Sequence, residues 1–101
     1  MIPALQNFRT YGLAIEFHEA CKQICLKASL KDQLTRATEG IILTLAEGSA
    51  RPTAKDRARF YAMALASFRE SQVALQLAGR ADLIKRFDRL GACLYKLSRC
   101  A

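Results

Sequence analysis

The sequence predicts an all-α protein, an antiparallel up-down-up-down four-helix bundle that forms a single domain over residues 1–101. Apolar residues recur at steps of three and four along most of the chain, and no stretch alternates as a strand does. Residues that start or stop helices gather near positions 28, 50 and 80, and such short connections join antiparallel neighbours. With 51% hydrophobic residues, the chain has enough apolar surface to bury a core.

The first helix is predicted over residues 3–27, because Pro3 suits a first turn, where a missing N–H costs nothing. It has two apolar stripes, on opposite flanks: one is Phe8, Tyr11, Ile15 and Leu26, and the other is Leu13, Phe17, Ala20 and Ile24. A helix that is apolar on two sides is covered on two sides. We therefore expect the stripe around Leu13, Phe17 and Ile24 to meet a neighbouring subunit.

The second helix is predicted over residues 30–47. Ser29 and Asp32 have the spacing of a capping pair at its start. Gly48 suits the position after its end, where a left-handed backbone costs a glycine nothing.

The third helix is predicted over residues 54–78. Pro52 prevents simple continuation of the preceding helix, and Thr53 with Asp56 forms a second capping pair. The later part of this helix has an apolar patch on its reverse side, which is a second candidate for subunit contact: Ala62, Ala66, Val73 and Leu77.

The fourth helix follows Gly79, which ends its predecessor, and Asp82, which we expect to cap it. It has an apolar seam of Leu83, Phe87, Leu90, Leu94 and Leu97, and an opposite basic stripe of Lys85, Arg89, Lys96 and Arg99. Across the four helices, we expect packing to bury Phe8, Ile15, Leu34, Ile41, Phe60, Leu75, Phe87 and Leu94.

The run RATEGIILTLAEGSAR and the later ALASFRESQVALQLA resemble a bacterial family of four-helix-bundle proteins encoded in intervening sequences of large-subunit ribosomal RNA. The sequence has Thr44-Leu45 where that family favours Asn-Ile, and Phe68 where it favours Leu. The matching positions are Arg36, Ala37, Ala46, Glu47, Gly48, Arg51, Phe60, Ala64, Ser67, Glu70 and Leu77. The resemblance implies a four-helix bundle, a homopentamer and no catalytic residues. The accessory variability proteins of diversity-generating retroelements share this architecture.

The net charge of +7 is confined to the second half of the chain. Residues 1–50 hold five basic and five acidic side chains, whereas residues 51–101 hold eleven and four. Such asymmetry favours an anionic partner, RNA or DNA first, although a basic surface can also be merely solvated. The candidate phosphate contacts are Arg51, Lys55, Arg59, Lys85 and Arg89. The alternative function is a protein-interaction scaffold for a polymerase or another partner, without direct nucleic-acid binding.

Metal and cofactor sites are not expected. His18, Cys21 and Cys25 share one face of the first helix, and with Cys93 or Cys100 they could in principle bind zinc. The paired C-x-x-C spacing of structural zinc sites is missing, which favours inert packing thiols.

An enzyme is not expected either. Glycine-rich phosphate loops are absent, and Glu39, Glu47 and Glu70 have no accompanying nucleophile, so ion pairing to Arg36 or Arg51 is the favoured role of Glu47. No apolar run reaches membrane-spanning length and the N-terminus does not resemble a secretory signal, so we expect a cytoplasmic protein.

Overall fold

The computed structural model describes residues 8–99, and no strand occurs among them. They form five helices: α2 (Arg9–Lys22), α3 (Ala28–Ser49), α4 (Ala54–Leu77), α5 (Ala81–Arg86) and α6 (Asp88–Ser98). The predicted all-α class is confirmed. The predicted helix start at Pro3 lies outside the described residues. None of the helices in the described part combines the length and apolar character needed to cross a bilayer.

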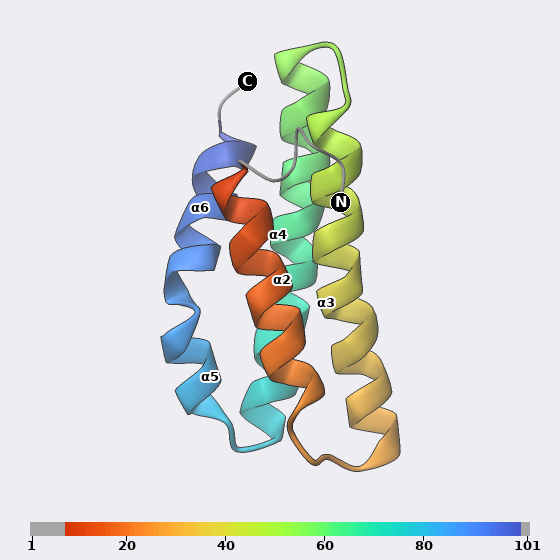
Figure 1. The fold of residues 1–101 in the computed structure, drawn as a ribbon, viewed down its shortest axis with the longest axis vertical. Helices are drawn as coiled ribbons and strands as arrows, with labels where there is room; N and C mark the ends of the chain where they lie inside the picture. Colours follow the sequence, from red (N-terminus) through yellow and green to blue (C-terminus); the bar gives the residue numbers. More distant parts are fainter. Residues whose placement is uncertain (1–7, 100–101) are drawn as a thin grey trace.

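The helices run lengthwise beside one another in a body of 40 × 26 × 22 Å (Figure 1). α3 packs along α4, α4 packs against α6, and α2 contacts both α3 and α6. α3 and α6 are therefore diagonal to each other. The turns after α2 and α4 lie at one end, and the α3–α4 turn lies at the other end with the last turn of α6 (Figure 1).

The predicted fourth helix is wrong in one respect, because it is two helices. The break lies at Phe87, whose backbone angles, φ −106° and ψ 22°, leave the α-helical region. The ring of Phe87 is buried, with its centroid 5.0 Å from that of Phe17. The residue that interrupts the helix is therefore also a core residue.

Most of the predicted core is buried as expected. Phe8 and Ile15 are only half-buried. The six that are buried are Leu34, Ile41, Phe60, Leu75, Phe87 and Leu94.

The expected role of the second apolar stripe of the first helix is wrong. Phe17 has no exposed surface within its own chain, because its ring packs against Phe68 at 5.4 Å as well as against Phe87. Ile24 is also buried, and Leu13 is partly buried against the same core. The stripe thus packs into the interior of its own subunit and leaves little surface for a neighbour.

The turn on either side of α4 is set by local residues, as predicted. The Thr53 hydroxyl accepts a hydrogen bond from the backbone N–H of Asp56 at 3.1 Å, which caps the start of α4. At its end, Gly79 has a left-handed φ of +73°. The N–H of Gly79 bonds to the carbonyl of Gln76, and that of Arg80 to Leu75, which is the Schellman pattern.

The predicted role of Gly48 as a left-handed terminator is wrong, because α3 continues through it to Ser49. Gly48 is buried, and a Cβ built on it would lie 2.9 Å from the ring of Tyr61 and 3.0 Å from the Cβ of Phe60. The glycine is therefore needed for the close approach of α3 and α4.

Two further predicted caps do not form. Ser29 does not cap α3, which begins after Lys27 without a side-chain cap. Asp82 does not cap α5 and instead accepts two hydrogen bonds of 2.9 Å from the Arg80 guanidinium, which lowers its pKa. The ammonium of Lys31 reaches the end of α2, where it donates to the carbonyls of Cys21, Lys22 and Ile24 at 3.2, 2.8 and 2.6 Å.

Candidate nucleic-acid interface

The positive charge of the protein lies on the side formed by α4, α5 and α6, which we call the basic side. α2 and α3 together carry four basic and five acidic residues, whereas α4, α5 and α6 carry eight and four. Among the described residues outside the helices, four more basic residues occur and no acidic one: Lys27, Arg51, Arg80 and Arg99. Three of these four flank α4 or follow α6, so they add to the same excess.

Lys55, Lys85 and Arg89 are the freest of the predicted contact residues. All three are exposed, Lys55 on α4, Lys85 on α5 and Arg89 on α6, and none has an ion-pair partner within residues 8–99. Lys96 on α6 and Arg99, directly after its end, follow Arg89 at helical spacing and are exposed as well. The basic stripe is therefore present, although the break at Phe87 divides it between two helices.

Arg51 and Arg59 are already held by other groups of the protein. Their guanidinium carbons lie 4.4 and 4.7 Å from the centroid of the Phe60 ring. Asp56 accepts from Arg59 at 3.0 Å and lies 3.8 Å from Arg51, which also approaches Glu47 at 3.7 Å. These carboxylates offset the charge of the two arginines and make them weaker candidates for phosphate binding.

The structure does not bring the five predicted residues into one cluster. Arg51, Lys55 and Arg59 lie at the end of the α3–α4 turn, whereas Lys85 lies towards the opposite end, on α5 (Figure 1). Instead, the start of α4 meets the last turn of α6. A shallow groove of about 440 Å³ lies between them, lined in part by Lys55, Arg59 and Ser98.

Tyr95 is a residue of this region that the sequence analysis did not single out. Its side chain is 51% exposed on α6, and the guanidinium carbon of Arg99 lies 5.7 Å from its ring centroid. Tyr61, the other tyrosine on the helices of the basic side, is buried and packs edge-on against Phe8 at 6.1 Å, so its ring is not available to a ligand. The sequence feature that could have identified Tyr95 is its position directly before Lys96, a residue of the basic stripe.

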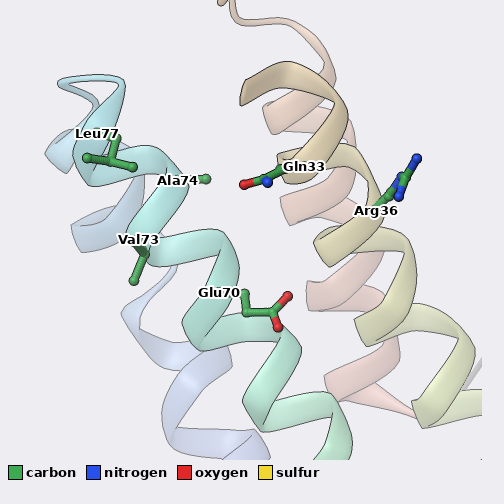
Figure 2. Close-up of a pocket in the computed structure, with 6 residues that line it drawn as sticks. All are labelled: Gln33, Arg36, Glu70, Val73, Ala74 and Leu77. Atoms are coloured by element: carbon green, nitrogen blue, oxygen red, sulfur yellow. The ribbon is translucent and has the colours of Figure 1, made fainter. Parts of the chain in front are cut away.

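The outer side of the α3–α4 pair has a different character, because exposed apolar side chains lie there beside polar and charged ones. Figure 2 shows Gln33 on α3 pointing towards Ala74 on α4, with the Glu70 carboxylate also turned towards α3. Val73 and Leu77 point away from α3, and the Arg36 guanidinium points away from α4. Leu43 lies seven residues after Arg36, and Met63 lies ten before Val73, so both fall close to this side. The exposed fractions of the four apolar side chains are 63% for Leu43, 45% for Met63, 56% for Val73 and 73% for Leu77.

The residues considered above as zinc ligands lie in different environments. His18 Nδ1 lies 2.7 Å from the Thr38 hydroxyl, Cys21 is buried and Cys25 is exposed. Burial raises the pKa of the Cys21 thiol to about 11. Within residues 8–99, no three His, Cys, Asp or Glu side chains are grouped so as to hold a metal ion. Cys100 lies outside the described residues.

Comparison with known proteins gives one finding. The family model described as 23S rRNA-intervening sequence protein matches residues 7–100. No curated protein and no solved structure matches the chain.

Proposed function

The chain belongs to the 23S rRNA-intervening sequence protein family, and we propose that it is a non-enzymatic, oligomeric protein that binds the phosphate backbone of RNA or DNA. The family description refers to the intervening sequence and does not state an activity. The support for binding therefore comes from the surface of this chain, and above all from one observation. The excess positive charge lies on the basic side, where Lys85 and Arg89 have no anionic partner among the described residues.

The chemistry of that side favours binding that depends little on sequence. A cation that neutralises a phosphate releases a condensed counterion, so affinity falls steeply as salt rises. Contacts to phosphates carry no base information. Lys55, Lys85 and Arg89 are the main contacts in this proposal, and Arg51 and Arg59 contribute less because Asp56 already binds both.

The basic side is expected to act in several copies. We take the helices as an up-down-up-down four-helix bundle whose fourth member is α5 followed by α6, and we propose that such bundles form a closed homo-oligomer. The outer side of α3 and α4 supports this, because four large apolar side chains are exposed there: Leu43, Met63, Val73 and Leu77. Each added subunit would bring another basic side, so weak phosphate contacts would act together. The resemblance to the family implies five subunits.

The experiment for binding removes the charges of Lys85 and Arg89 and compares the result with an equal loss of charge elsewhere. The test variant is Lys85→Gln with Arg89→Gln. The control is Lys27→Gln with Arg36→Gln, at the start of α3 and within it, because α3 lies diagonally across from α6. Fluorescence anisotropy with labelled RNA and DNA is measured over a range of salt concentrations.

The test variant should bind all sequences more weakly and flatten the slope of log affinity against log salt by about 1.4 to 1.8, for two lost phosphate contacts. The control should stay near the wild-type curve. If both variants lose affinity equally, binding depends on net charge alone and the basic side is not the interface.

The experiment for assembly uses Val73→Asp with Leu77→Asp, because both side chains are exposed and a charge there should not disturb the core. Light scattering should report an oligomer for the wild type and a folded monomer for the variant. Wild type that runs as a monomer at micromolar concentration refutes the assembly. Wild type that assembles and captures one protein partner after nuclease treatment, yet binds no nucleic acid, supports the scaffold function instead.

A further inference from the structure

Tyr95 stands apart from the other aromatic residues of the protein. The chain has five Phe and three Tyr, all within the described residues, and Tyr95 is the one among them that is exposed. Six of the other seven pack against the core cluster or form part of it, and Phe60 is buried between two arginines. A single exposed tyrosine is common on protein surfaces, so its neighbours decide whether it has a function.

The ring of Tyr95 has a cation beside it, because the Arg99 guanidinium carbon lies 5.7 Å from the ring centroid. The Tyr95 carbonyl accepts a hydrogen bond of 2.7 Å from the hydroxyl of Ser98, which fixes the last turn of α6. Ser98 in turn lines the groove that Lys55 and Arg59 border, together with Asp56, which pairs with Arg59. An aromatic face with a guanidinium beside it thus lies about one helical turn before a residue of a groove that contains Lys55, which has no ion-pair partner among the described residues.

From this arrangement we infer that Tyr95 and Arg99 form a stacking platform for an unpaired base, and that the ligand of the basic side is single-stranded nucleic acid. The inference rests on the proposed function and specifies its ligand. Bases in a duplex are stacked on one another and do not offer a free face to a side chain on the protein surface. In a single strand, every base has a free face, and each base stacked on an aromatic ring raises affinity by about 5- to 150-fold.

The charge of the site fits this ligand. The strand would place phosphates near Lys55 while one base lies on the Tyr95 ring, and Arg99 extends the stack through its planar guanidinium. Because stacking tolerates any base, selection would be for strandedness and not for sequence.

The first experiment separates stacking from charge. A labelled mixed-sequence RNA oligonucleotide is titrated alone and annealed to its complement, at about 50 mM salt, where phosphate contacts are strong. Tyr95→Leu should lose about 5- to 150-fold in affinity for the single strand with an unchanged salt slope, because no charge is removed. Its affinity for the duplex should stay unchanged, and Tyr95→Phe should restore single-strand binding.

The second experiment uses the absence of tryptophan from the sequence. In Tyr95→Trp, the indole at the platform is the sole tryptophan, and a base stacked on it should quench its fluorescence. Tyr11→Trp, at a half-buried position on α2, is the matched control and should show no quenching. Quenching by the single strand but not by the duplex supports the platform.

The outcomes distinguish the inference from the function beneath it. The stacking platform is refuted if wild type binds the single strand and the duplex equally, if Tyr95→Leu has no effect and if Tyr95→Trp shows no quenching. Those results would still be consistent with a phosphate interface. Failure of wild type to bind either form overturns both.

Discussion

Replacement of Phe17 by alanine tests whether this residue belongs to the core of its own subunit or to a subunit interface. The side chain has no exposed area, and its ring lies 5.4 Å from that of Phe68 and 5.0 Å from that of Phe87. Truncating a buried phenylalanine costs about 3–5 kcal/mol, because apolar burial is lost and a cavity remains. Each lost ring pair accounts for about 0.5–1.5 kcal/mol of this.

The assay is thermal unfolding followed by circular dichroism at one fixed protein concentration, because assembly makes the midpoint depend on concentration. For a domain of this size, each kcal/mol shifts the midpoint by about 4–8 °C, so Phe17→Ala should lower it by more than about 12 °C. Arg89→Ala is the control, since that side chain is exposed on α6, away from the proposed subunit contact, and its truncation should change stability by less than about 0.5 kcal/mol. A Phe17→Ala protein that unfolds like wild type but has fewer subunits would refute the core assignment.

Three further predictions concern stability and thiol chemistry. Gly91→Ala should lower the free energy of unfolding, measured in urea, by about 1–3 kcal/mol, because the new Cβ would lie 2.7 Å from the ring of Phe68. Gly12→Ala should raise the same free energy by up to about 1 kcal/mol, because its new Cβ meets open space, and equal effects of the two changes would contradict this. Lys31→Met should cost about 1–3 kcal/mol, since three carbonyls at the end of α2 lose their donor, and an unchanged urea midpoint would contradict it. At pH 8, a thiol reagent should label the exposed Cys25 at once and the buried Cys21 only after unfolding, as detected by mass spectrometry. Because the pKa of Cys21 in the folded protein is raised to about 11, the contribution of this thiol to stability is complete below about pH 8.5 and falls as the pH rises through 11.

The features that sequence predicted well depend on residues close together in the chain. Thr53 caps α4 through a backbone N–H three residues away, and Gly79 ends the same helix through bonds within one turn. The helical period identifies the buried positions of α3, such as Leu34 and Ile41, because one side of that helix packs inward.

The features that sequence missed depend on contacts between distant segments. Gly48 looks like a terminator until the Tyr61 ring is placed 2.9 Å from where its Cβ would be. The two apolar flanks of α2 suggested two interfaces, but Phe17 meets rings from α4 and from the α5–α6 break. The helix break at Phe87 could not be predicted from local residues, because neither Phe87 nor the residue on either side of it is glycine or proline.

The candidate interface divides in the same way. Its excess of positive charge is a property of composition and could be read from the sequence. The sequence could not show which cations are free of ion pairs. Arg51 and Arg59 converge on Asp56, whereas Lys85 and Arg89 have no such partner within the described residues. The importance of Tyr95 also depends on knowing that its ring is exposed.

The most direct measurement of the central claim is the salt dependence of nucleic-acid binding by the wild-type protein, freed of bound nucleic acid during purification. Single- and double-stranded RNA and DNA are titrated by gel retardation and anisotropy, from about 50 to 200 mM salt. The proposal predicts retardation at the low end with little dependence on sequence, and a straight fall of log affinity with log salt whose slope counts the phosphates neutralised. No retardation of any of these nucleic acids at about 50 mM salt would contradict it, and the cations of the basic side would then serve only to keep the surface hydrated.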